Sequence, residues 1–160
     1  MLDRSNLILK NDKFLKAYKS IRVAEANRKF CNHDIDHLLS VARIMLIRDS
    51  EMQEIKTNKD ILYALALLHD IGRAKQYEIG IDHNIAGGIV AKSILLECKF
   101  DDNEIKLITS AIENHNNLSA SSYLAQLLQY ADQLSRNCFL CEVRNECNWE
   151  EEQKNKGIKI

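Results

Sequence analysis

The chain has 160 residues, of which 46% are hydrophobic and 28% are charged, as in an ordinary globular domain. Its net charge of −1 at pH 7 argues against a basic surface that would bind DNA or an anionic membrane. No apolar run reaches the ~20 residues that cross a bilayer, and charged residues interrupt the N-terminal segment where a signal peptide is apolar, so we expect a cytoplasmic protein.

Hydrophobic residues recur at spacings of three and four, and the chain has no proline and only five glycines, which favours helices over strands. This pattern predicts an all-α fold, a single bundle of about six helices. The expected helices are 12–29, 34–49, 58–69, 84–97, 102–115 and 120–137. Residues 1–137 would form the helical domain, and residues 138–160 a cysteine-containing tail that packs on it.

Three local patterns mark these helices. The sequence TNKD at 57–60 matches a capping box at the start of the third helix, and DDNE at 101–104 announces the fifth. Between them, helix 84–97 contains the pair Gly87 and Gly88, and a glycine inside a helix costs about 1 kcal/mol relative to alanine. The pair therefore predicts that another element approaches this helix closely.

The stretch ALALLHDIGR (64–73) ends an apolar helix in a histidine and an aspartate. Burying such a pair costs several kcal/mol unless a charge or hydrogen bond compensates it. Three further histidines lie at or near the ends of apolar helices, and a second aspartate interrupts the sixth helix. The candidate residues are His37, His69, Asp70, His83, His115 and Asp132. Because their helices share one core, we expect a metal cation to neutralise the two aspartates.

The ligand types limit the choice of metal. Imidazole and carboxylate ligands favour iron or manganese, with zinc, cobalt, nickel or magnesium as alternatives. Six ligands exceed the need of one tetrahedral zinc and suffice for two ions that share a bridging carboxylate, so we expect one or two divalent ions per chain. We interpret the fifth histidine, His33, as a helix cap or a partner of the helix dipole.

These residues resemble the HD-domain superfamily of metal-dependent phosphohydrolases over residues 33–137. The family pattern is a histidine, a His-Asp doublet and a distal aspartate, and it is matched by His37 in HLLSVAR, by LLHDIGR and by YADQLSR. His83 in HNIAGG and His115 in AIENH resemble the subset with a second metal, which includes cyclic-dinucleotide phosphodiesterases and small hydrolases of diadenosine tetraphosphate. Without proline, the chain lacks the Gly-Tyr-Pro motif of the diguanylate-specific enzymes.

The resemblance implies hydrolysis of a phosphoester or phosphoanhydride, in a small phosphorylated substrate that we expect to be a nucleotide. One ion would be bound by His37, His69, Asp70 and Asp132, and the second by Asp70 as a bridge with His83 and His115. A metal-activated hydroxide would attack phosphorus, with Asp70 central to catalysis. Arg73, helped by Lys75, would bind the substrate and neutralise its phosphoryl oxygens. The alternative is that the sequence GRAK is a solvated helix exit.

Two other functions fit the same ligands. Some HD-like proteins with these six ligands hold mixed-valent iron and oxidise substrates with dioxygen, so a di-iron oxygenase is one alternative. The other is a sensor that binds a nucleotide without turnover. The sequence implies no particular oligomeric state.

The five cysteines are an odd number in a compartment that we expect to be reducing, which disfavours disulfides. Cys138, Cys141 and Cys147 form a C-x2-C-x5-C pattern, whose first spacing suits metal chelation. Cys31 is the candidate fourth ligand of a second metal site if the two ends of the chain meet. The alternative is that these residues are small apolar groups that pack the tail, as we expect of Cys98 in the core.

Overall fold

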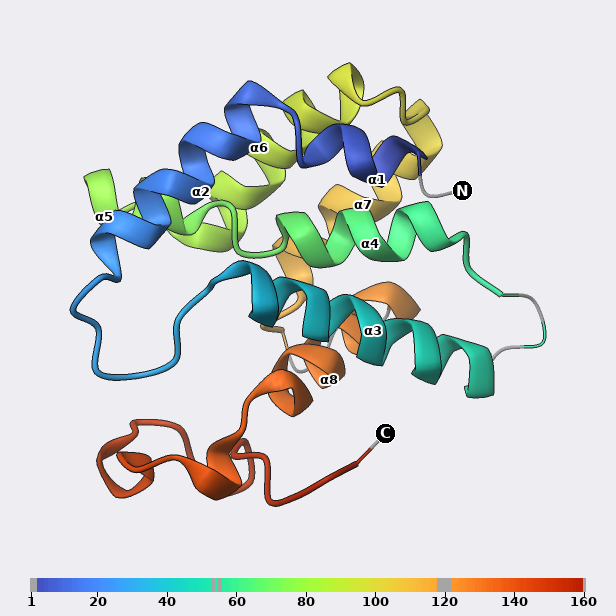
Figure 1. Cartoon of the computed structure of the whole chain (residues 1–160). Helices are drawn as coiled ribbons and strands as arrows, with labels where there is room; N and C mark the ends of the chain where they lie inside the picture. The colour runs from blue at the N-terminus through green and yellow to red at the C-terminus, as the bar shows by residue number, and fades with distance from the viewer. Residues whose placement is uncertain (1–2, 53, 55, 118–121, 160) are drawn as a thin grey trace.

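The computed structural model describes residues 3–52, 54, 56–117 and 122–159. In these residues it has eight α-helices, two short 3-10 helices and no strand, which confirms the all-α prediction (Figure 1). The helices are α1 (Asp3–Ile8), α2 (Asp12–Ala24), α3 (Ile35–Met52), α4 (Lys59–Leu68), α5 (Arg73–Ile79), α6 (His83–Glu97), α7 (Asp102–Asn114), α8 (Tyr123–Ser135), η1 (Cys138–Leu140) and η2 (Arg144–Glu146). The start expected for the last long helix, residue 120, and both chain ends lie outside the described residues.

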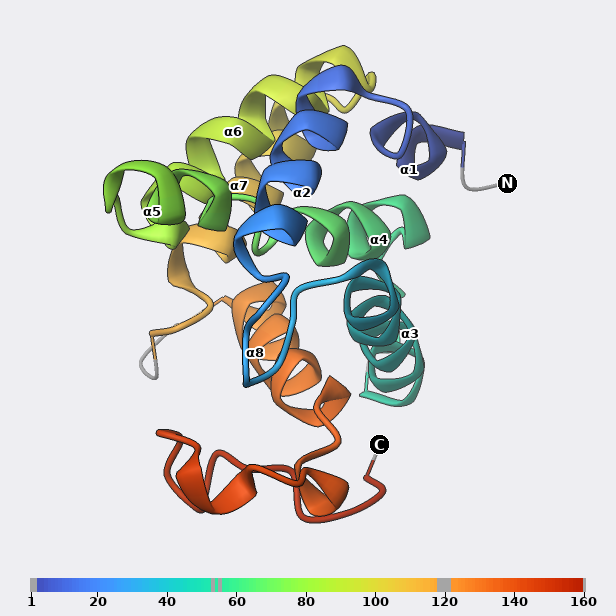
Figure 2. The same cartoon turned by 60° about the vertical axis from the view of Figure 1, so that its left-hand side comes forward.

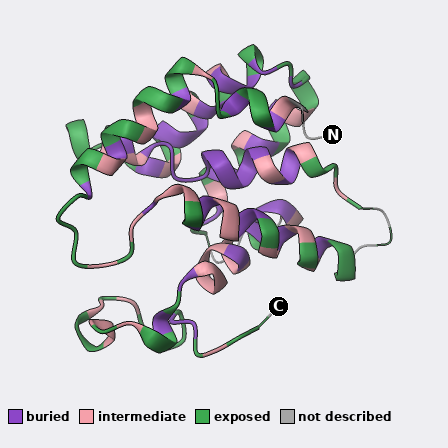
Figure 3. Cartoon of the chain, in the orientation of Figure 1, coloured by how far each residue is buried: buried purple, intermediate pink, exposed green. Residues whose placement is uncertain are grey.

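Helix α4 is the centre of the bundle and, after its exposed first residue Lys59, is buried apart from the half-buried Asp60 and Tyr63, as expected of a helix that is mostly apolar (Figure 3). Helix α3 packs against both α4 and α8, and α7 packs against α4, α6 and α8 (Figure 2). No single described helix is long and apolar enough to cross a membrane; the segments 59–79 and His83–Glu97 meet that test only as a pair bent by 119°.

Two short helices, α1 and α5, were not predicted, and α2 ends at Ala24 rather than at residue 29. Helices of six and seven residues are not stable alone, so tertiary contacts decide them. Helix α1 packs on α4, where the Ser5 hydroxyl donates to the Asp60 carboxylate at 2.8 Å, and its Ile8 is fully buried in the core. The end of α2 follows from Glu25, whose carboxylate accepts the backbone N–H of His33 at 2.8 Å and draws the following loop back over the bundle.

The capping predictions had mixed outcomes. The Asp101–Glu104 capping box at α7 is confirmed, with both of its hydrogen bonds present. At α4 the prediction was wrong, because Asn58 caps the helix by accepting the N–H of Asp60 at 2.8 Å. The Thr57 hydroxyl instead donates to the buried carboxylate of Asp49 on α3 at 2.7 Å, which ties the α3–α4 connection together.

The close approach predicted at the paired glycines is confirmed. A Cβ on Gly87 would lie 3.0 Å from the Ile112 side chain of α7, and one on Gly88 would lie 2.3 Å from the Glu113 carboxylate. The turn between α4 and α5 approaches even more closely, because a Cβ on Gly72 would lie 2.0 Å from the carbonyl oxygen of His83. The end of α4 and the start of α6 are therefore in direct backbone contact.

The segment after α8 lies below that helix in both views and is mostly exposed or half-buried (Figures 1 to 3). The Asn155 amide donates to the carbonyls of Leu134 at 3.0 Å and Arg136 at 2.9 Å. Lys29, on the loop before α3, pairs with Glu146. These contacts support the expected packing of residues 138–160 on the helical domain 1–137, a division that stays a prediction.

Candidate metal centre

The His-Asp pair lies where α4 ends. His69 is the C-cap residue and is fully buried, and the side chain of Asp70 is only 3% exposed. The N–H of Arg73 then donates to the carbonyl of Asp70 at 3.0 Å, which turns the chain into α5. This turn holds the pair inside the protein rather than in solvent.

The other four predicted ligands lie at the ends of four other helices. His37 is in the first turn of α3, His83 is the first residue of α6, His115 is the C-cap of α7, and Asp132 is in the last turn of α8. The bundle brings these helix ends together, so side chains that are up to 95 positions apart surround Asp70.

The six side chains form two groups that share Asp70. In the first group, Asp70 Oδ2 lies 3.0 Å from His69 Nε2 and 3.8 Å from His37 Nε2. Asp132 Oδ1 completes this group at 3.3 Å from His37 Nε2. In the second group, Asp70 Oδ1 lies 3.9 Å from His83 Nε2, and His115 is the third member. Within each group, every ligand atom lies within 4.8 Å of the others.

Hydrogen bonds orient three of the imidazoles. The Nδ1 atoms of His69 and His115 lie 2.8 and 2.6 Å from the carbonyl oxygens of Ala66 and Ile112. A carbonyl only accepts, so Nδ1 carries the proton in both rings and the lone pair is left on Nε2. The Ser135 hydroxyl donates to the carbonyl of Asp132 at 2.6 Å, so its oxygen accepts from His37 Nδ1 at 3.0 Å. The Nε2 atoms therefore point their lone pairs at the centre, as metal-ligating histidines do.

Unpaired buried atoms test whether a cation fits. His69 Nε2, Asp70 Oδ2 and Asp132 Oδ1 are buried without a hydrogen-bond partner among the described residues. Each such atom costs about 1–3 kcal/mol when it is left unsatisfied. A divalent cation between these atoms would satisfy all three, so the donor set fits a metal.

The protonation states also suit metal binding. Burial of the Asp70 carboxylate disfavours its ionisation, but the neighbouring His69 and His37 outweigh burial and hold its pKa well below the ordinary range. Burial lowers the pKa of His37 to about 4 and that of His83 to about 4. Burial of His69 lowers its pKa, but the charge of Asp70 outweighs this effect, so the pKa of His69 is raised.

The two predicted substrate-binding cations differ in position. Arg73 Nε donates to Asp70 Oδ1 at 2.6 Å, and the Arg73 side chain is 21% exposed, so it lies at the edge of the centre. Lys75 lies on another face of α5, and its role in substrate binding stays a prediction. Because α5 begins at Arg73, a residue two positions later points to another face of the helix, and Lys75 pairs with Glu78 in solvent.

Two residues near the centre were missed or misread in the sequence. His33 does not cap α3, since the Asp34 side chain accepts the N–H of His37 at 2.9 Å. Instead His33 is buried, its Nδ1 bound to the Glu25 carboxylate and its Nε2 3.6 Å from Asp70 Oδ2. Arg136 was not singled out, although its spacing of four from Asp132 is a signal that could have found it.

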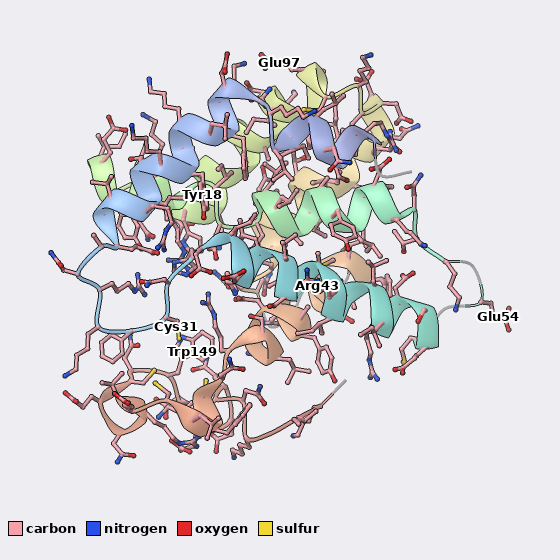
Figure 4. All side chains as sticks on the ribbon, in the orientation of Figure 1. Tyr18, Cys31, Arg43, Glu54, Glu97 and Trp149 are labelled. Atoms are coloured by element: carbon pink, nitrogen blue, oxygen red, sulfur yellow. The ribbon has the colours of Figure 1, made fainter. Side chains whose placement is uncertain are left out.

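A cavity of about 100 Å³ lies beside the centre, between it and the C-terminal segment. His33, Arg73, Asp132 and Arg136 line it from the side of the centre. Across from them lie the loop before α3 and the C-terminal segment, on which Cys31 and Trp149 are labelled in Figure 4.

Comparisons with known proteins agree with this geometry. Residues 34–137, which carry all six candidate ligands, match the HD domain family. The chain belongs to the HD domain family. This HD-domain chain is 39% identical over 154 residues to an uncharacterized protein of Clostridium beijerinckii, covering 96% of this chain and 97% of that one.

More distant relatives share only part of the chain or only the fold. Ribonuclease Y of Listeria monocytogenes is 34% identical over 101 residues, which is 63% of this HD-domain chain and 18% of the ribonuclease. A crystal structure from an uncultured Thermotogales bacterium, described as a predicted HD superfamily hydrolase, matches with a TM-score of 0.63 and 24% identity. The match covers 88% of this chain and 80% of that one, and it supports the fold alone.

Proposed function

We propose that this HD-domain protein is a metal-dependent phosphohydrolase that acts on a small phosphoester or phosphoanhydride. The observation that carries the proposal is the sharing of Asp70, whose two carboxylate oxygens face two separate groups of ligands. Two ions about 3.5–4 Å apart, joined by one carboxylate, are a common arrangement for displacement at phosphorus. Iron or manganese is the favoured metal, because the ligands are imidazoles and carboxylates.

The side chains of the centre would bind the metal ions, orient the substrate and neutralise its phosphoryl oxygens. When bound, divalent ions lower the pKa of a bound water to about 7 and polarise a phosphoryl oxygen. The backbone carbonyls behind His69 and His115 fix both rings, so the ligand lone pairs are preorganised. Asp132 and Arg73 remain 18% and 21% exposed, which leaves one edge of the centre open to a small substrate. There the Arg73 guanidinium would pair with phosphoryl oxygens as charge develops on them.

A nucleotide is the favoured substrate. A nucleotide polyphosphate or phosphodiester offers one phosphoryl oxygen to the metal centre and further anionic oxygens to Arg73. Ribonuclease Y, by its name, acts on RNA, which is a phosphodiester, and this chain is 34% identical to it over 101 residues.

Exchanging Asp70 for asparagine tests the proposal. Asp70→Asn keeps the shape and removes the shared negative charge, so we expect at least one ion to be lost and phosphohydrolase turnover to fall by more than about 100-fold. The matched control is Lys75→Gln, which also removes one charge but lies in solvent. Metal would be counted on anaerobically purified protein, and phosphate release measured with nucleotides and phosphate esters.

Three outcomes would contradict the proposal. Asp70→Asn protein with both ions and near-normal turnover would refute the bridging role. Oxygen uptake without phosphate release would indicate an oxygenase. Nucleotide binding without turnover, after incubation with manganese or iron, would indicate a sensor.

A second pair of variants tests the assignment of the histidines. His83→Ala should lower the metal content from two ions per chain to about one. His33 lies outside both ligand groups, so His33→Ala should retain both ions, while Glu25 loses the imidazole and keeps the Tyr77 hydroxyl as a partner. Loss of metal in His33→Ala but not in His37→Ala would reverse the choice between these two residues.

A further inference from the structure

Four of the five cysteines line the cavity between the metal centre and the C-terminal segment. Cys31 comes from the loop before α3, Cys138 begins η1, and Cys141 and Cys147 lie on either side of η2. More than 100 positions separate Cys31 from the other three, so the fold brings the loop before α3 to the C-terminal segment. The fifth cysteine, Cys98, is buried in the core at the end of α6.

The four sulfur atoms are spaced too widely for a single zinc ion. A tetrahedral zinc with bonds of about 2.3 Å places its four sulfurs about 3.8 Å apart. Among the described residues, the groups of three or more ligand atoms that lie within 4.8 Å of one another are the two at the histidine centre, and the thiols form none. The thiols nevertheless interact, because the three others add to the rise that burial causes in the pKa of Cys31. The four thiols therefore line a cavity and do not converge on the position of a single ion.

Positively charged side chains line the cavity and would stabilise an anionic group bound there by the four cysteines. These side chains are those of Arg28, Arg73, Arg136, Arg144 and Lys154. Arg136 is only 7% exposed, and its Nε–H is buried without a hydrogen-bond partner among the described residues. A buried donor of this kind costs about 1–3 kcal/mol unless it meets an acceptor. The lining therefore suits an anionic group with hydrogen-bond acceptors of its own.

We propose that Cys31, Cys138, Cys141 and Cys147 bind an iron–sulfur cluster in this cavity. In such a cluster, bridging sulfides separate the iron atoms, so four thiolates can bind it at a wider spacing than one ion allows. The cluster with its thiolates is an anion, and its sulfides accept hydrogen bonds from donors such as the Arg136 Nε–H. It would join the loop before α3 to the C-terminal segment. This site lies beyond the proposed hydrolysis and does not depend on it.

Acid-labile sulfide is the measurement that isolates this site, because iron at the histidine centre brings no sulfide with it. The full chain would be purified without oxygen, and also reconstituted with ferrous iron, sulfide and a thiol reductant. We expect sulfide bound to the chain together with broad visible absorption, and the number of sulfides per chain gives the nuclearity. Asp70→Asn should lose iron from the histidine centre and keep its sulfide, so a failure of the proposed hydrolysis is distinguishable from a failure here.

Single cysteine variants identify the ligands. Cys141→Ser should lose the sulfide and the absorption, whereas the matched control Cys98→Ala should keep both. Retention of the sulfide in folded Cys141→Ser would overturn the assignment. If Cys141→Ser does not fold, the measurement on the wild type alone tests the proposal. Absence of bound sulfide from the reconstituted wild type would refute the cluster. One zinc per chain without sulfide, or cysteines paired as disulfides without metal, would also overturn the proposal.

Discussion

The contact between the α4–α5 turn and α6 makes Gly72→Ala a severe change for so small a substitution. A Cβ at this position would lie 2.0 Å from the carbonyl oxygen of His83, 2.4 Å from the backbone nitrogen of Gly87 and 2.8 Å from its Cα. All three are backbone atoms, so no side-chain rotation relieves the overlap. Relief requires the turn after Asp70 to move away from the first turn of α6, which would separate Asp70 from His83.

The expected cost follows from this geometry. Overpacking in a close-packed interior costs about 1–3 kcal/mol when the surroundings can adjust, and here a rigid backbone must shift by more than 1 Å, so we expect about 3 kcal/mol or more. Urea unfolding followed by circular dichroism would measure it. Gly157→Ala is the matched control, because nothing lies within 4 Å of the added methyl group. If Gly72→Ala unfolds at the urea concentration of that control, the close approach is wrong.

Two further predictions concern stability alone. Asp101→Ala removes the capping box of α7 and should lower the free energy of unfolding by about 1 kcal/mol; an unchanged urea midpoint would contradict the cap. Glu25 has a pKa of about 2 against an ordinary 4.5, since hydrogen bonds from His33 and Tyr77 outweigh the opposing effect of burial. A carboxylate with a lowered pKa stabilises the fold above the ordinary value, so the stability advantage of wild type over Glu25→Gln should shrink as pH falls from 4.5 towards 2. A difference independent of pH in that range, measured by urea unfolding, would refute the assignment.

The sequence predicted the long helices and the meeting of six histidine and aspartate side chains because both depend on local pattern. The apolar helix that ends in His69 and Asp70 can be predicted from its own residues alone. The spacing of apolar residues likewise predicted the other helices whose ends meet around Asp70. The paired glycines could be interpreted for the same reason, since a glycine in an otherwise apolar helix indicates a close neighbour.

The remaining features depend on tertiary contacts that a local pattern does not contain. Helices α1 and α5 are too short to form without the core against which they pack. The position of Lys75 on another face than Arg73 was not foreseen because α5 was not predicted, and residues two positions apart share a face in a strand but not in a helix. The burial of His33 depends on the loop that Glu25 holds in place, and that loop has no periodic pattern.

Arg136 occupies a position that a metal in the first ligand group would contest. Its Nη2 lies 3.0 Å from His37 Nε2 and 3.6 Å from Asp132 Oδ1, so the guanidinium donates to the lone pair that would bind the ion. Its Nη1 donates to the carbonyl of Asn32 at 2.7 Å, which holds it there. Two unit charges 4 Å apart repel by about 4 kcal/mol at an effective dielectric constant of about 20, and a divalent ion doubles this figure.

Removing the guanidinium should therefore strengthen metal binding. Side-chain movement and solvent reduce most of the repulsion, so we expect Arg136→Gln to tighten manganese binding at the first group at least tenfold, which is about 1.4 kcal/mol. Manganese suits this test because it prefers nitrogen and oxygen ligands to the nearby thiols. The control is Arg43→Gln, which removes the same charge from the exposed side of α3 (Figure 4). Calorimetric titration that gave Arg136→Gln an affinity equal to or weaker than that of the control would show that the arginine supports the ion rather than competing with it.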